Sequence, residues 1–251
     1  MTFAPPRDPE RRMSVPKGRV LVIAPHPDDE TIGPGGTLRL HALQGDPIVA
    51  VFIASGIGGD PDGYFGREAL PEIRRREAEE AARRIGIRET VFLGYPDNLG
   101  AGDFGKVFGD LPSDPVEARR ALVHGISTLV AGLVDAHRPD VVYYPWDGEL
   151  NPDHWMVGQG VRNLLAVDDA RRNGASWLGY EVWAACTPDT VVDVSDTMGD
   201  KLKAIDAYAS QLIYRDYAPH VRGLAAYRAL LLEAGAVYGE AFTGRYRGAD
   251  A

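Results

Sequence analysis

The sequence predicts an α/β fold with a mainly parallel, doubly wound sheet flanked by helices. Apolar runs of strand length alternate along the chain with segments of helical period, and the connections between them are short. Polar side chains follow two of the apolar runs directly, which is where open α/β sheets keep their ligands. These two observations place a functional site at the carboxyl edge of the sheet.

The elements follow from the apolar periodicity taken in order. Strands are expected over 20–24, 47–54, 90–94, 141–144, 180–185 and 190–194. Helices are expected over 38–43, 70–85, 116–134, from 154 to about 165, over 202–212 and over 221–232. Gly45 and Gly86 are the expected terminators of the first two helices. The sequence shows no repeat and no linker to a second domain.

Length and composition favour one domain. With 251 residues, of which 45% are hydrophobic, the chain can bury a substantial core. We assign residues 19–248 to a single domain and residues 1–18 to a flexible N-terminal arm, because the arm carries Pro and Arg instead of an apolar run.

Charge and cysteine usage restrict the partners. The net charge of −9 argues against nucleic acid or an anionic membrane as a partner and favours a neutral or cationic small molecule. No apolar run is long enough to cross a membrane. Cys186 is the single cysteine, so the sequence predicts no internal disulfide, no thiolate zinc site and a cytoplasmic setting. The oligomeric state stays open, including a homo-oligomer.

Two polar clusters carry the chemistry. His26, Asp28, Asp29 and Glu30 follow the strand over 20–24, and Pro152-Asp-His154 follows the strand over 141–144. A hydrolytic zinc site needs about three His or carboxylate ligands and a nearby base that is not a ligand. We therefore predict His26, Asp29 and His154 as metal ligands. Asp28 is the candidate base for the water, whose pKa zinc lowers to roughly 7.

The acidic turn and the glycine segment after it each have an alternative interpretation. An acidic turn after a strand is also typical of a helix N-cap. The imidazole before the acids and the second Pro-Asp-His element favour the metal site instead. The segment Gly33-Pro-Gly-Gly36 lacks the G-x-G-x-x-G spacing and a following Walker lysine, which argues against a nucleotide cofactor.

Several motifs resemble the PIG-L/LmbE family of metal-dependent N-acetylglucosaminyl deacetylases. They lie at 24–36, 74–77 with Ala81 and Ile85-Gly86, 96–97, 152–154, 201–211 and 237–242. The resemblance implies a Rossmann-like fold with one catalytic zinc, which removes the N-acetyl group of an amino sugar or its glycoconjugate. By matching position, His26, Asp29 and His154 would bind the metal and Asp28 would be the general base. Arg74 and Asp97 would then contact the sugar.

One position departs from the family pattern. The second motif usually reads His-x-Asp-His, and here the first His is replaced by Asn151. An Asn amide can still donate a hydrogen bond to an oxyanion, which is worth roughly 3 kcal/mol, but it cannot carry a positive charge or deliver a proton. Asn151 is therefore a candidate catalytic residue, and it leaves open whether turnover is retained.

Other roles stay open at this stage. Asp153 either orients a metal ligand from behind or starts the helix, and Glu30 is expected to brace the turn or a ligand. Arg74 is alternatively a helix-surface residue, and Asp97 a turn residue. Tyr214, Tyr217 and His220 form either a substrate wall or ordinary packing.

The alternatives for function follow from the same residues. His and carboxylate ligands suit zinc but also accept ferrous iron, cobalt or manganese. The substrate is either an amino-sugar conjugate or a non-sugar or longer-chain N-acyl amide of secondary metabolism. A metal-holding binding protein without turnover is the non-enzymatic alternative. We expect the loops 55–68 and 97–113 to decide specificity.

Overall fold

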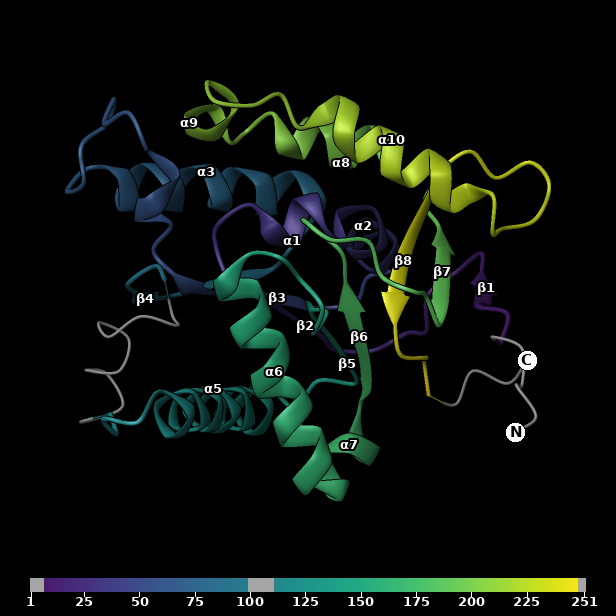
Figure 1. The fold of residues 1–251 in the computed structure, drawn as a ribbon. Helices are drawn as coiled ribbons and strands as arrows, with labels where there is room; N and C mark the ends of the chain where they lie inside the picture. The colour runs from purple at the N-terminus through teal and green to yellow at the C-terminus, as the bar shows by residue number, and fades with distance from the viewer. Residues whose placement is uncertain (1–6, 99–110, 248–251) are drawn as a thin grey trace.

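The structure, a computed structural model, describes residues 7–98 and 111–247 as one α/β unit (Figure 1). The strands, in sequence order, are β1 (Glu10–Arg12), β2 (Val20–Ala24), β3 (Ile48–Ala54), β4 (Glu89–Tyr95), β5 (Val141–Pro145), β6 (Ser176–Tyr180), β7 (Thr190–Asp193) and β8 (Gly239–Thr243). They form one sheet in the order β1-β7-β8-β6-β5-β2-β3-β4. The pairs of β8 with β6 and with β7 are antiparallel and the other pairs are parallel, so the predicted mainly parallel sheet is confirmed.

Helices cover both faces of the sheet (Figure 1). One face carries α1 (Asp29–Ile32), α2 (Gly35–Leu43), α3 (Leu70–Ile85), α8 (Met198–Ile205), α9 (Ala209–Leu212) and α10 (Ala218–Ala229). The other carries α5 (Pro115–His137), α6 (Pro152–Val167) and α7 (Asp169–Gly174). A short 3₁₀ helix, Ile57–Gly59, follows β3.

The strand β2 shows why both faces need helices. Every residue of β2 is buried, and its side chains alternate between two cores. Val20 and Val22 pack in the core under α2, α3 and α8, whereas Leu21 and Ile23 pack in the core under α5 and α6. An unbroken apolar run is therefore the sequence of a strand covered on both sides, as expected.

The position of β2 sets the position of the site. β2 pairs with β3 on one side and with β5 on the other, and the chain continues outward from each of them. Between β2 and β5 the strand order reverses, and this switch point is where doubly wound folds bind their ligands. The two predicted polar clusters follow these two strands, so the fold brings them together.

Several elements differ from the sequence prediction. The strand expected over 180–185 lies at Ser176–Tyr180, and the helix expected over 202–212 is two helices, α8 and α9. The turn between them buries Tyr208, whose hydroxyl donates a hydrogen bond to Glu30. Strand β8 was not predicted, because it is short and contains the buried Glu240. Within the predicted N-terminal arm, Glu10–Arg12 pair with β7 as an edge strand.

The glycine-rich turn after α1 has a packing role. A Cβ at Gly33 would meet the Tyr180 ring at 2.4 Å, and one at Gly36 would meet Val194 at 2.8 Å. Glu240 caps α2 by accepting hydrogen bonds from the backbone N–H groups of Gly36 and Thr37. These glycines therefore allow close contact with β6, with the residue that follows β7 and with Glu240 of β8.

Two further expectations, on the loop over 97–113 and on the domain boundary, are not tested by the structure. Most of the loop over 97–113 lies outside the described residues. The boundary of the single domain at 19–248 stays a prediction. In the described ranges, 7–98 and 111–247, the structure contains no helix with the length and apolar content of a membrane span.

Candidate metal centre

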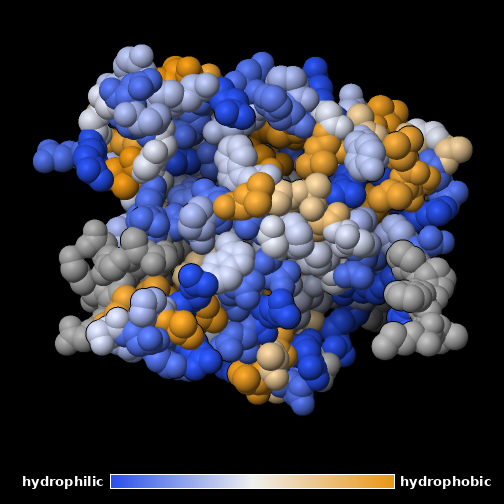
Figure 2. Space-filling view, viewed as in Figure 1, coloured by the Kyte–Doolittle hydropathy of each residue, from blue (hydrophilic) through white to orange (hydrophobic). Residues whose placement is uncertain are grey.

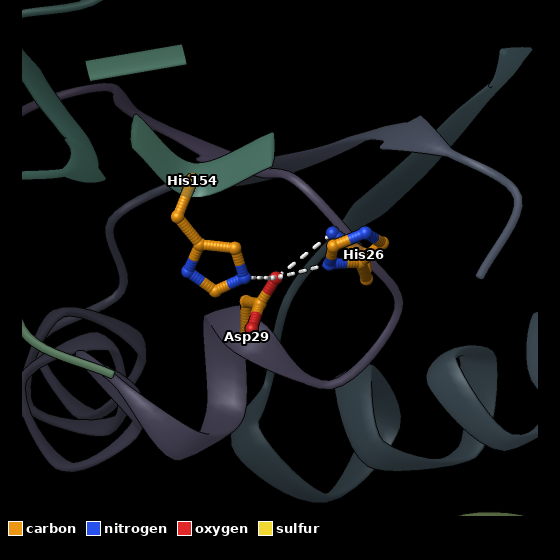
Figure 3. A group of neighbouring side chains, drawn as sticks. All are labelled: His26, Asp29 and His154. Carbon is orange, nitrogen blue, oxygen red and sulfur yellow. Dashed lines mark hydrogen bonds and ion pairs between the residues drawn. The ribbon is translucent and has the colours of Figure 1, made fainter. Parts of the chain in front are cut away.

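Three predicted ligands meet at the carboxyl ends of β2 and β5 (Figure 3). His26 follows β2, Asp29 begins α1, and His154 lies in the first turn of α6. One ligand atom from each lies within 4.8 Å of the others. Asp29 Oδ2 is the centre of the group, at 3.4 Å from His26 Nδ1 and 3.1 Å from His154 Nε2. The same oxygen accepts a hydrogen bond of 2.8 Å from the backbone N–H of His26.

The orientation of His26 is fixed from behind. Its Nε2 donates to Asp153 Oδ2 at 2.9 Å, which leaves Nδ1 to face Asp29. Burial alone would lower the pKa of His26, but the hydrogen bonds to Asp153 and Asp29 raise it to about 10. In spite of burial, the nearby imidazoles of His154 and His26 hold the pKa of Asp29 well below its usual range. Without a cation, this cluster therefore stabilises a protonated His26.

The surroundings of His154 indicate whether these residues fit a metal. Its side chain is fully buried, and neither ring nitrogen has a hydrogen bond of acceptable geometry among the described residues. A buried imidazole without hydrogen bonds is costly unless another group is bound. Glu149 Oε2 lies 3.8 Å from Nδ1 and is placed behind the ring, so Nε2 is the nitrogen directed at Asp29. Two imidazoles and a carboxylate fit a divalent transition metal.

Asp28 lies between the ligands in the sequence but points elsewhere. Its φ of 139° is rare for a residue with a side chain and costs of order 1–3 kcal/mol. Asp28 Oδ2 forms an ion pair of 2.9 Å with Arg74. Burial raises the pKa of Asp28 to about 7 against the lowering effect of Arg74. This carboxyl group can therefore exchange a proton near neutral pH.

Glu30 braces the strained turn. Its side chain is fully buried, and Oε2 accepts a hydrogen bond of 3.1 Å from the backbone N–H of Asp28. Its other oxygen accepts hydrogen bonds from Thr31 and Tyr208. Burial raises the pKa of Glu30 to about 7. The structure thus places Glu30 as a support of the turn and not as a ligand.

The two candidate substrate residues also hold the loop that follows β3. Arg74 is 3% exposed, and it donates hydrogen bonds to the carbonyl oxygens of Pro27 and Gly56 as well as contacting Asp28. Asp97 accepts hydrogen bonds from the N–H groups of Gly56 and Gly58, at 2.7 and 2.6 Å, and one from the Ser55 hydroxyl. Arg74 is therefore not a helix-surface residue, because the loop and the turn enclose it.

Asn151 is the N-cap of α6. Its Oδ1 accepts a hydrogen bond of 2.8 Å from the backbone N–H of Asp153, which leaves the side-chain NH₂ group available as a donor. Asp153 is thus both a residue of the first turn of α6 and the partner of His26. The two interpretations of Asp153 that the sequence left open both describe its position.

Part of this centre lines a cavity of about 280 Å³. Of the sequence candidates, His26, Asp28, Asp29, Arg74, Asp97 and Asn151 form part of its wall, with Gly58, Gly59, Trp183, Gln211 and Tyr217. Trp183 and Gln211 were not predicted, because their approach depends on the loop after β6 and on the short helix α9. Glu149 was not predicted to contact a metal ligand, although its carboxylate accepts hydrogen bonds from Val182 and Trp183 and lies behind His154.

Comparisons with known proteins agree with this geometry. A probable N-acetyl-α-D-glucosaminyl L-malate deacetylase 2 of Bacillus cereus is 29% identical over 208 residues, which cover 76% of this chain and 83% of that protein. A 1D-myo-inositol 2-acetamido-2-deoxy-α-D-glucopyranoside deacetylase of Kineococcus radiotolerans is 32% identical over 68% of this chain and 51% of its own length.

A solved structure shares both fold and sequence. The N,N'-diacetylchitobiose deacetylase of Pyrococcus horikoshii, complexed with its inhibitor, superposes with a TM-score of 0.65 at 27% identity, over 91% of this chain and 84% of that one. The family model described as PIG-L, GlcNAc-PI de-N-acetylase, matches residues 21–165, which include every predicted metal ligand. The resemblance read from the motifs is confirmed, and the chain belongs to the PIG-L family.

Proposed function

We propose that this protein is a metal-dependent deacetylase, which hydrolyses the N-acetyl group of a small N-acetylglucosamine conjugate. The observation that carries the proposal is the group of His26, Asp29 and His154 with Asp28 beside it. His26, Asp28 and Asp29 line a cavity of about 280 Å³, and His154 is buried behind them. Family membership and the deacetylases among the relatives support the same class of activity.

His26, Asp29 and His154 would hold the metal. A divalent ion at this position supplies Lewis acidity, which polarises the acyl oxygen and makes a water molecule more acidic. Asp153 and Glu149 keep the two imidazoles in position from behind. Zinc suits this donor set, and ferrous iron, cobalt and manganese suit it as well.

Asp28 is the proposed general base and acid. Its carboxyl group lines the cavity and is not needed as a ligand. In the reaction, Asp28 would accept a proton from the attacking water and then return it to the departing sugar amine. Arg74 supports this role, since its ion pair favours the carboxylate while burial favours the acid.

Asn151 is the proposed donor to the oxyanion. The carbonyl oxygen of the acetyl group becomes negatively charged in the tetrahedral transition state, and the Asn151 NH₂ group at the cavity wall can donate to it. Because an amide does not ionise at neutral pH, the proton for the leaving amine is assigned to Asp28 alone.

Arg74 and Asp97 are proposed to contact the sugar. A carboxylate offers about four acceptor positions, and Asp97 uses three with the loop after β3. One position therefore remains for a sugar hydroxyl. Arg74 contributes mainly by fixing Asp28 and the same loop, whose residues Gly58 and Gly59 line the cavity.

The substrate is proposed to be a small amino-sugar conjugate, by analogy with the relatives named above. A longer N-acyl chain or a non-sugar amide is the enzymatic alternative, and a metal-holding protein without turnover is the non-enzymatic one. The cytoplasmic setting and the absence of nucleic-acid and membrane partners stay predictions from the sequence, which leaves the oligomeric state open.

The test is acetate release by protein loaded with each metal in turn. N-acetylglucosamine and its glycosides are the substrates, and N-butyryl and N-octanoyl glucosamine probe the acyl chain. Acetate release with the N-acetyl compounds as the best substrates is the expected result. Faster release of the longer acids would favour the alternative hydrolase, and full metal content without release from any amide would favour a binding protein.

A further inference from the structure

A second cavity, of about 190 Å³, lies next to the candidate active site. It is enclosed by α10, by the start of β8 and by the loop after β6, which includes Val182 and Trp183. Its volume is roughly six times the ~30 Å³ that one water molecule takes up in the liquid, so it admits a small organic group. Figure 2 shows apolar side chains, in orange and tan, gathered beneath α10 in the middle of this face.

Two aromatic residues belong to both cavities. Trp183 and Tyr217 line the active-site cavity and also line the second cavity. Their ring centroids are 6.2 Å apart, with an edge-to-face angle of 65°. Trp183 is 43% exposed, so its ring is not locked in the core. The two cavities are therefore neighbours, and these two side chains form their common boundary.

The buried charges around the second cavity are already paired. Lys201 Nζ lies 2.6 Å from Glu240 Oε1 and also donates to the carbonyl oxygen of Gly33. Glu181 forms a buried ion pair with Arg228 and accepts a hydrogen bond from the backbone N–H of Cys186. These groups form neutral pairs, so they offer no net charge to a ligand.

Arg215 and His220 belong to none of these ion pairs. Both line the cavity and both are exposed at its rim. Within the part of the chain that the structure describes, no carboxylate lies within ion-pair distance of Arg215. The apolar walls, formed by residues such as Val221 and Leu224, carry no competing charge. This combination suits an anion on a short apolar stem.

We infer that the second cavity binds the group attached to the amino sugar, and that this group carries a carboxylate that pairs with Arg215. The inference rests on the proposed function, because it needs the sugar at the metal centre. It adds a specificity-determining residue outside that centre. Arg215 supplies the charge, His220 supplies a further hydrogen-bond donor, and Trp183 and Tyr217 stack against the linkage between the sugar and the anion.

The test compares two matched substrates of metal-loaded protein. The carboxymethyl and carbamoylmethyl glycosides of N-acetylglucosamine, of the same anomer, differ only in a carboxylate or a neutral amide. We expect the KM of the carboxymethyl compound to be lower by about tenfold or more, since a charge-assisted hydrogen bond to Arg215 favours it. Arg215→Gln is expected to bring the two KM values within about twofold of each other.

The control is Arg222→Gln, which removes the same charge from an exposed position of α10 that does not line either cavity. This variant is expected to keep the preference of the natural chain. Equal KM values for the two glycosides in the natural chain, or an equal loss of preference in both variants, would overturn the inference.

A second readout separates this inference from the proposed function. The methyl glycoside reports deacetylation without an anionic group, so absence of acetate release from it contradicts the function and not the second cavity. Calorimetric binding of the two matched glycosides to the metal-loaded protein does not need turnover. Equal dissociation constants for the carboxymethyl and carbamoylmethyl compounds in that experiment would also overturn the role of Arg215.

Discussion

His26 Nε2 lies 2.9 Å from Asp153 Oδ2, and this contact joins the two halves of the metal centre. His26 follows β2, whereas Asp153 lies 127 residues later in the first turn of α6. The hydrogen bond leaves Nδ1 of His26 directed at Asp29, which is the orientation that a metal ligand needs. Asp153, which is not one of the three predicted ligands, therefore sets the orientation of His26.

Asp153→Asn is expected to weaken metal binding about 10- to 100-fold, because partners behind a ligand contribute that much to affinity. The amide keeps the size of the side chain, but its neutral oxygen is a weaker acceptor than the carboxylate and its NH₂ group favours the opposite tautomer of His26. Competition with a chromophoric chelator measures the affinity. Asp147→Asn is the control, since Asp147 pairs with the exposed Arg162. Equal affinity of the two variants would contradict the role of Asp153.

Replacement of Asp28 by glycine is expected to stabilise the protein relative to replacement by alanine. Both variants lose the ion pair with Arg74, but only glycine adopts a φ of 139° without a steric penalty. The expected difference in the free energy of unfolding is about 1 kcal/mol. Urea denaturation of the two metal-free variants measures it. If the alanine variant were equally stable, the turn would not be strained.

Asn151→Asp is expected to separate the two roles of this residue. Aspartate caps a helix as well as asparagine does, so the melting temperature should change little. The carboxylate cannot donate to an oxyanion, and kcat is expected to fall about 10²-fold. Asn151→Ala should lose both properties, with about 1 kcal/mol of stability. An unchanged kcat in the aspartate variant at full metal content would remove Asn151 from the mechanism.

Asn151→His introduces the histidine that the family's second motif, His-x-Asp-His, usually has at this position. An imidazole can carry a proton and a positive charge at the position of the amide, so the acidic or basic limb of the pH–rate profile is expected to move. Steady-state rates between pH 5 and 9 provide the measurement, as a range of about two units on each side of neutrality covers an ordinary imidazole. A profile that stays the same would count against any catalytic role of position 151.

Stability is expected to fall on the acid side partly because of His41. This fully buried side chain contacts Asp46 and the hydroxyl of Tyr143, and burial lowers its pKa in spite of Asp46. Below the pKa of an unfolded histidine, about 6.5, the unfolded chain takes up a proton that the folded chain resists. The free energy of unfolding should therefore decrease as the pH falls below that value.

The variant His41→Asn identifies this contribution. Its stability is expected to be lower at neutral pH, because a buried hydrogen-bonded ring is lost, and to depend less on pH below about 6.5. Urea denaturation of metal-free protein at several pH values gives the two curves. The metal ligands titrate in both proteins, so their effect cancels in the difference. Parallel curves would contradict the assignment to His41.

The sequence was sufficient where one stretch of chain determines the structure. The apolar run at Val20–Ala24 predicted a strand covered on both faces. The segment from His26 to Glu30, directly after this strand, predicted two of the three residues of the candidate metal site. Both are local patterns, in which neighbouring residues share one environment. His154 was found because its own motif follows a second apolar run of the same kind.

Contacts between distant segments were not visible in the sequence. Glu149 lies behind His154 because the backbone N–H groups of Val182 and Trp183 hold its carboxylate. The spacing of these residues in the sequence does not predict this contact. Strand β8 was missed because Glu240 interrupts its apolar pattern. The charge of Glu240 is tolerated because Lys201, 39 residues away, pairs with it and the backbone N–H groups of Gly36 and Thr37 donate to it.

The most direct test is the acetate released by Asp28→Asn at full metal content. The change preserves the shape of the side chain and removes its ability to exchange a proton, and metal analysis shows that the ligands still bind. General acid and base catalysis contributes about 10²- to 10⁴-fold, so kcat for N-acetylglucosamine conjugates is expected to fall by at least ~10²-fold. Near-normal turnover by a fully loaded Asp28→Asn protein would contradict the proposed mechanism.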